Sequence, residues 1–322
     1  MVVDSNGAPA CGSLPVMRIA EIALQDNSPR WLVEGLWGAS SVGVIGGAPK
    51  CSKTWLGLDL ALSVATGTAC LGRYAVPQPG PVLVYLAEDA LPIVRQRVEG
   101  MARHRGLALE QVDLYVITAP TLRLDRDPHR RQLQETAKRL RPRLLLLDPL
   151  VRLHGIDENS ASEVAELLAY IRMLQRQLNL SVILVHHTRK NTSGGIAAGQ
   201  SLRGSGDLHA FGDSNLYLRR TKDRLVLSSE HRAAPAAPPV SLELVASDPE
   251  TTHLEVVAER RGEPQPSLSE QVLALLAEGT VLTRAKLRGT LAVKNELLGD
   301  VLESLEQAGR LRHTPAGWQR LD

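Results

Sequence analysis

The octapeptide GAPKCSKT at positions 47–54 constrains the fold of this 322-residue chain more than any other stretch. It follows a short apolar run, residues 42–45, and opens a helical pattern that starts at Trp55. A tight loop between a buried strand and a helix N-terminus is the setting of a phosphate-binding loop, where backbone N–H groups surround an anion. We therefore predict an ATP site with Mg²⁺. Its predicted nucleotide-binding residues are Gly47, Ala48, Pro49, Lys50, Cys51, Ser52, Lys53, Thr54 and Trp55.

The loop departs from the pattern G-x-x-x-x-G-K-[ST] at one position, where Ser52 stands in place of the second glycine. Serine is small enough to let the backbone approach a phosphate, but its φ is less free than that of glycine. Lys53 adds a point charge for the β- and γ-phosphates, and Thr54 offers its hydroxyl to Mg²⁺.

Two further apolar runs end in carboxylates. Residues 143–148 finish at Asp148, and residues 81–89 finish at Glu88 and Asp89. All-apolar strands are typical of a parallel sheet that is covered on both faces, and ligands bind at the carboxyl ends of such strands. We predict that Asp148 lies on the metal side and that Glu88 deprotonates or orients the attacking water. Asp89 is expected to be the N-cap of the helix that follows.

A third apolar run, residues 181–185, ends in His186 and His187. An imidazole at this edge of the sheet can hydrogen-bond a γ-phosphate or its water and so sense whether ATP is bound. The sequence leaves the choice between the two histidines open. Zinc is disfavoured because no cysteine or carboxylate stands at metal-ligand spacing from this pair.

Strand and helix patterns alternate up to His187, with helices expected at residues 54–66, 91–104, 129–141 and 161–179. This alternation predicts an α/β fold with a parallel sheet. Beyond residue 215 the apolar period becomes two, which predicts antiparallel strands that extend the sheet at residues 215–220, 224–228, 240–245 and 253–258. Between the two parts, the Gly- and Ser-rich residues 188–206 include Arg189 and Lys190, a candidate DNA-contacting loop.

The expected domain organisation has four parts. Residues 1–29 form a loosely ordered arm, residues 30–261 the ATPase domain, residues 262–266 a linker, and residues 267–322 a small winged-helix-like domain of three helices and a hairpin. From residue 265 on, seven basic and seven acidic side chains cancel, and the expected third helix is acidic. DNA contact and protein docking therefore remain equal alternatives for this domain.

Composition limits the class of protein. A net charge of +2 excludes a chain that coats nucleic acid by bulk charge. Three cysteines with no paired spacing favour a reducing compartment, and no apolar stretch reaches membrane length. We expect a cytoplasmic protein.

Five motifs in this order resemble those of RepA-type AAA ATPases, which are hexameric helicases of RecA fold. They are residues 47–54, VYLAED at 84–89, LLLDPL at 145–150, VHHTRK at 185–190 and RGSG at 203–206. The resemblance implies a RecA-like ATPase ring acting on single-stranded DNA. It assigns phosphate and Mg²⁺ to Lys53 and Thr54, and catalysis to Glu88, Asp148 and His187, with His186 as the alternative to His187.

One element of that family is missing. The arginine finger expected after the RGS motif falls on residues 211–215, which hold no arginine, so Arg203, Arg219 or Arg220 would have to replace it. A finger contributes roughly 10³–10⁵ in rate where it acts. The sequence thus predicts a DNA-dependent motor or helicase. The alternative is an ATP-dependent regulatory or loading module that binds DNA or a protein without unwinding.

Overall fold

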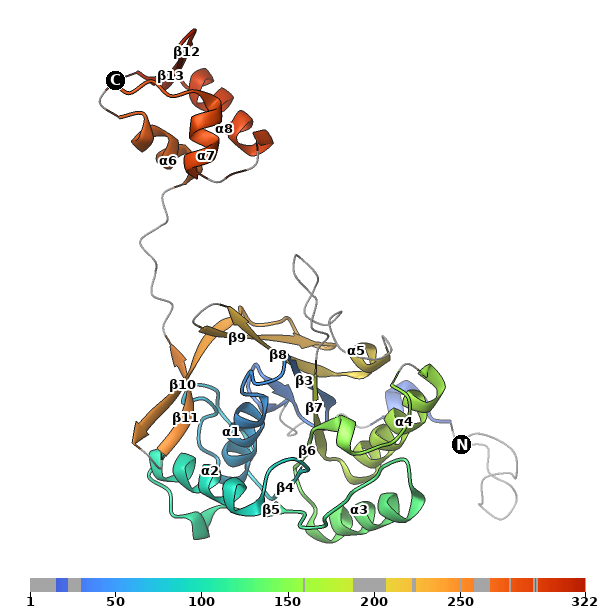
Figure 1. Ribbon diagram of the computed structural model, residues 1–322. Helices are drawn as coiled ribbons and strands as arrows, with labels where there is room; N and C mark the ends of the chain where they lie inside the picture. Colours follow the sequence, from blue (N-terminus) through green and yellow to red (C-terminus); the bar gives the residue numbers. More distant parts are fainter. Residues whose placement is uncertain are drawn as a thin grey trace. The chain divides into compact units, whose positions relative to one another are not determined.

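The computed structural model divides into two compact units, Met1–Ala258 and Glu259–Asp322 (Figure 1). It describes residues 16–22, 30–158, 160–187, 207–221, 224–248, 251–257, 267–277, 279–291, 293 and 295–321. Most of the predicted arm, the loop at 188–206 and the linker at 262–266 lie outside these residues. Within the arm, Ile19–Glu21 forms one 3₁₀ turn, η1.

A nine-stranded sheet organises the larger unit, in the order β11-β10-β9-β8-β3-β7-β6-β4-β5. The strands are β3 (Val42–Gly47), β4 (Val82–Leu86), β5 (Leu114–Val116), β6 (Leu144–Asp148), β7 (Ser181–His187), β8 (Ser214–Thr221), β9 (Arg224–His231), β10 (Val240–Asp248) and β11 (Thr251–Val257). A separate two-stranded sheet joins β1 (Trp31–Val33) to β2 (Trp37–Gly38).

Helices cover both faces of the parallel strands, which explains why those strands are apolar throughout. One core cluster joins α1 (Lys53–Thr66) and α2 (Leu91–His104) to one face of the sheet. A second cluster joins α3 (Asp127–Leu140) and α4 (Ala161–Leu178) to the other face. Two 3₁₀ turns, η2 (Leu109–Gln111) and η3 (Leu150–Arg152), and the short α5 (Asp207–Phe211) complete the unit. The predicted α/β fold with a parallel sheet is confirmed.

The expected orientation of the strand at residues 215–220 is wrong in one respect. β8 is antiparallel to β9 but pairs with β3 in parallel, with Gly47 opposite Leu218. The cause is that β8 follows α5 and starts beside the first residue of β3, so the two strands run in the same direction. There the Asp213 N–H donates to the Val42 carbonyl at 2.7 Å. Antiparallel extension therefore starts one strand later, with β9, β10 and β11.

The antiparallel end of the sheet curls around α1 and reaches α2 (Figure 1). Leu254 of β11 belongs to the same buried cluster as α1, and the rings of His104 on α2 and His253 on β11 stack 3.5 Å apart. Enclosure of this kind explains why α1 is buried around nearly its whole circumference and carries only a weak apolar-polar pattern. The phosphate-binding loop at its N-terminus is thus held by both halves of the sheet.

The smaller unit contains three helices and a hairpin: α6 (Leu268–Leu275), α7 (Arg284–Leu291), α8 (Asn295–Gln307), β12 (Leu311–Thr314) and β13 (Gly317–Arg320). A capping box starts α6, because Ser267 accepts from the Glu270 N–H while the Glu270 carboxylate accepts from the Ser267 N–H. Leu282 and Trp318 form an isolated antiparallel bridge that links the segment before α7 to the hairpin. The winged-helix interpretation stays a prediction.

None of the helices in the described part of the chain is long and apolar enough to cross a membrane.

Candidate nucleotide-binding site

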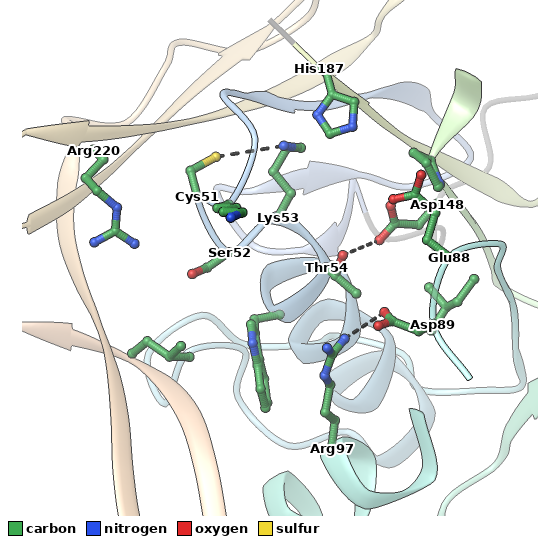
Figure 2. A pocket seen from close by; sticks show the side chains of 15 residues that line it. Cys51, Ser52, Lys53, Thr54, Glu88, Asp89, Arg97, Asp148, His187 and Arg220 are labelled. Carbon is green, nitrogen blue, oxygen red and sulfur yellow. Dashed lines mark hydrogen bonds and ion pairs between the residues drawn. The ribbon is translucent and has the colours of Figure 1, made fainter. Parts of the chain in front are cut away.

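A cavity of about 420 Å³ opens where β3, β4, β6 and β7 end, with β8 and β10 at its side (Figure 2). Residues 50–55 of the loop form its base. The other side chains that line it come from the ends of β4, β6, β7 and β8, from the middle of β10 and from α2: Leu86, Glu88, Asp89, Arg97, Asp148, Pro149, His187, Arg220 and Leu244. The predicted residues Gly47, Ala48 and Pro49 precede this part of the loop and do not line the cavity. The structure therefore brings together most of the predicted site.

Alternation along the strands explains this convergence. Leu86, Leu146, Val185 and Leu218 all belong to the core cluster on the α1 side of the sheet. Side chains two residues further along a strand point to the same face. Asp148, His187 and Arg220 therefore project toward the N-terminus of α1, where the loop lies, and Glu88 reaches the same cavity from the segment that follows β4.

The loop adopts left-handed backbone at two non-glycine positions, Lys50 with φ of 62° and Ser52 with φ of 63°. Ser52 is the N-cap of α1 and stands where the motif has glycine, so its conformation is the one that glycine adopts without strain. A left-handed residue with a Cβ is less stable by about 1–2 kcal/mol. Serine thus preserves the geometry of the loop with some strain.

Lys53 is 5% exposed and its Nζ lies inside the loop. The ammonium donates to the carbonyls of Gly47 at 3.0 Å and Ala48 at 2.8 Å, and lies 4.0 Å from the Cys51 Sγ. Burial lowers the pKa of Lys53, while electrostatic interactions with Cys51, Asp148 and Glu88 oppose that change. A buried cation with acidic groups on one side and open cavity on the other is suited to bind polyphosphate.

Thr54 and Asp148 form the metal side of the cavity. The Thr54 hydroxyl donates to Asp148 Oδ2 at 2.6 Å, and Asp148 is 5% exposed. Burial raises the pKa of Asp148 from 3.8 to about 6, against the lowering effects of the Thr54 hydrogen bond and of Lys53. Two hard oxygen donors side by side fit Mg²⁺, which binds proteins through one or two carboxylates together with water and phosphate.

Glu88 and Asp89 each pair with an arginine. Arg152 Nε lies 2.8 Å from Glu88 Oε1, and Arg97 Nη1 lies 2.7 Å from Asp89 Oδ2. The expectation that Asp89 caps the following helix is wrong, because Ala90 occupies the N-cap of α2 and no side chain caps it. Asp89 instead holds Arg97, whose guanidinium lies over the ring of Trp55 at 5.3 Å.

The two histidines at the end of β7 face opposite sides of the sheet. His187 lines the cavity, whereas His186 is 2% exposed on the α3 and α4 side. There burial lowers the pKa of His154, and the nearby His186 adds to that effect. Geometry therefore favours His187 for any contact with the nucleotide.

The candidate arginine fingers also differ in their position relative to the cavity. Arg220 lines the cavity from β8, while its neighbour Arg219 points to the opposite face of that strand. Arg203, Arg189 and Lys190 lie outside the described residues, so their predicted roles stay predictions.

Sequence reasoning missed Arg97, Arg152 and Leu244. Arg97 stands eight residues after Asp89, about two turns of helix, and this spacing was a usable signal. No sequence pattern pointed to Arg152 or Leu244. They reach the site through η3 and through the curl of the antiparallel strands.

Comparison with known proteins adds the family. The family model of the AAA domain matches residues 12–193, more than half of the chain. The chain belongs to the AAA domain family. Because the matched part contains the loop, Glu88, Asp148 and His187, this AAA protein is a P-loop NTPase, and nucleotide with Mg²⁺ is what its family generally uses.

Solved structures show the same fold in distant proteins. A RadB recombinase superposes with a TM-score of 0.50 at 17% identity, over 68% of this chain and 92% of the recombinase. A DnaB-like replicative helicase, solved in a study of its interactions with primase, superposes with a TM-score of 0.50 at 15% identity. That match covers 67% of this chain and 57% of the helicase chain. These likenesses establish a RecA-like core for the AAA protein.

Proposed function

We propose that this chain is a RepA-type ATPase that couples ATP hydrolysis to work on single-stranded DNA as a motor or helicase. The observation that carries the proposal is the convergence, in one cavity, of Lys53, the Thr54–Asp148 pair, Glu88 and His187. These groups come from the N-terminus of α1 and from the ends of three strands, β4, β6 and β7. Together they supply the cation, metal side, base and sensor that phosphoryl transfer to water requires.

Each residue has one role in this proposal. Lys53 neutralises the phosphates from the base of the loop, and Thr54 with Asp148 holds Mg²⁺. When bound, that ion supplies charge neutralisation of the phosphate oxygens. Glu88 takes the proton of the attacking water, and His187 hydrogen-bonds the γ-phosphate or that water.

The DNA partner and the ring are inferred from two sources. The sequence motifs resemble those of RepA-type hexamers, and the solved structures with this fold are named as a recombinase and a replicative helicase. We infer that the protein is a homo-oligomer, with a hexameric ring as the expected form. We also infer that it acts in the cytoplasm. Winged-helix-like geometry of residues 267–321 would then add a second contact with DNA or a protein.

Hydrolysis measured with and without DNA tests the proposal. We expect single-stranded DNA to raise the turnover of ATP, and Lys53→Ala to abolish hydrolysis while the melting curve still shows a cooperative transition. Lys138→Ala is the matched control, because Lys138 is an exposed lysine on α3 that does not line the cavity. Turnover unaffected by any nucleic acid would argue against a motor.

A second function is favoured by the charge of α8. Glu296, Asp300, Glu303 and Glu306 are all exposed on that helix, which disfavours its entry into a DNA groove. An ATP-dependent regulatory or loading module, whose smaller unit holds a protein, fits this surface. It predicts ATP-dependent assembly without strand separation, and unwinding of a forked duplex would exclude it.

A further inference from the structure

Arg220 lies on β8, the strand that pairs with the start of the phosphate-binding loop of its own chain. It follows Leu218 by two residues on β8, so both side chains point to the α1 face of the sheet, and Leu218 is buried there. Leu218 pairs with Gly47, the first residue of the loop. The end of β8 therefore delivers Arg220 to the edge of the cavity (Figure 2).

Contact between the two backbones leaves little freedom in this arrangement. A Cβ added at Gly47 would lie 2.5 Å from the Leu218 carbonyl oxygen and 2.6 Å from the Cys51 Sγ. Because the backbone of β8 packs directly against Gly47 at this point, the backbone of Arg220 is held close to the loop that carries Lys53. Its charge is felt inside the loop, where it acts with Lys53 to lower the pKa of Cys51 against the larger raising effect of burial.

The guanidinium of Arg220 is also not paired with a carboxylate in the described part of the chain. The other two arginines beside the site are paired, Arg97 with Asp89 and Arg152 with Glu88. Within the described residues, the side chain of Arg220 forms neither an ion pair nor a hydrogen bond with another side chain. An exposed guanidinium with no carboxylate beside it, at the edge of a cavity that already holds Lys53, is available to an anion.

We propose that Arg220 is a phosphate-binding and catalytic cation that acts in cis, on the nucleotide of its own subunit. It would replace the arginine that RecA-type rings supply from a neighbour, so a complete site would not depend on the adjacent subunit. The inference rests on the proposed function, because it concerns the same cavity and the same phosphates.

Nucleotide affinity provides a test that does not depend on turnover. A charge-assisted hydrogen bond contributes enough for a loss of about 10-fold or more when it is removed. We expect Arg220→Ala to weaken binding of ATP and of a non-hydrolysable ATP analogue by about that factor, measured by calorimetry at fixed salt. AMP binding should change less, and Arg220→Lys should restore part of the affinity. Arg219→Ala is the matched control, since it removes an arginine from the other face of the same strand.

Subunit mixing distinguishes action in cis from action in trans. We expect Arg220→Ala to lower kcat by about 10²–10³-fold, the size seen when one charge-stabilising donor is lost. Arg220→Ala mixed with Lys53→Ala should stay inactive, because every subunit of the mixture lacks a cation in its own site. Recovery of activity on mixing, as the two variants complement each other across an interface, would overturn the proposal.

The remaining outcomes are also decisive. Unchanged ATP affinity in Arg220→Ala, or a loss in Arg219→Ala instead, would show that Arg220 is not the cation. If the wild-type protein binds ATP but does not hydrolyse it, the proposed function fails, while the affinity contrast between the two arginine variants still decides where Arg220 acts. A wild-type protein that hydrolyses ATP as a monomer, with Arg220→Ala inactive, supports action in cis directly.

Discussion

The ends of β4 and β6 lie side by side in the sheet and both carry a carboxylate into the cavity, yet the two groups are held in opposite ways. Asp148 at the end of β6 is 5% exposed and accepts a hydrogen bond from Thr54. Glu88, two residues beyond β4, has a side chain that is 49% exposed and pairs with Arg152, which is 63% exposed.

The difference means that the metal-side carboxylate is preformed, whereas the position of the catalytic base is adjustable. The metal-side pair lies on a strand and on a buried helix, so its geometry is fixed by the core, as a cation site requires. Glu88 lies in the loop between β4 and α2, and an exposed ion pair of this kind contributes little to stability. The position of the base can therefore change at small cost in free energy, while that of Asp148 cannot.

The largest effect that would sharpen this comparison is expected from Glu88→Gln. The amide keeps the shape of the side chain but cannot accept a proton, so hydrolysis should fall by roughly 10²–10⁴-fold. ATP binding should persist, because the loop and Asp148 are untouched. Phosphate release and nucleotide affinity measure the two quantities. If the variant hydrolyses ATP at the parental rate, Glu88 is not the base and Asp89→Asn becomes the next substitution.

Asp148→Asn tests the preformed side and should act on both function and stability. Because the folded pKa of about 6 exceeds the ordinary 3.8, the folded chain binds a proton more tightly than the unfolded chain, and its free energy of unfolding falls as pH rises through 6. The amide removes this penalty, so the nucleotide-free variant should be about 3 kcal/mol more stable at pH 7.5 and equal to the parent below pH 4.

Denaturant unfolding at the two pH values gives this difference, and Mg²⁺-dependent nucleotide affinity gives the functional loss. Affinity for ATP with Mg²⁺ should fall in the variant, whereas affinity without Mg²⁺ should change little. A variant that is less stable than the parent at pH 7.5 would mean that the carboxylate is stabilised by its surroundings and that the site is not strained by burial.

The smallest expected effect is that of Arg152→Ala. Loss of an exposed pair is worth about 0.2–1 kcal/mol, so kcat should rise by no more than about 5-fold as Glu88 is released. Arg95→Ala, which removes a similar exposed pair with Glu99 on α2, provides the control. A fall of 100-fold would show that Arg152 itself acts on the nucleotide, and the contrast between the two strand ends would then be incomplete.

Much of the fold could be read from local patterns. The predicted helix at residues 91–104 coincides with α2, and the helices expected at 54–66 and 161–179 match α1 and α4 within one residue at each end. For α2 and α4 this agreement is expected because their apolar period is strong, whereas α1 has a weak period and its start was indicated by the phosphate-binding loop before it. β5 was not predicted, because three residues at the edge of a sheet give too short a pattern.

By itself the sequence determined the loop, the order of the motifs and the strand ends that bear Glu88, Asp148 and His187. These are properties of neighbours along the chain, set by backbone conformation and by alternation of side chains. Only the tertiary structure decided that His187 rather than His186 faces the cavity, that Asp89 pairs with Arg97, and that β8 is parallel to β3. The reason is physical: which face of a strand is covered, and by what, depends on residues far away in the sequence. For Arg220 the decisive neighbour is Gly47, which the sheet brings into register with Leu218.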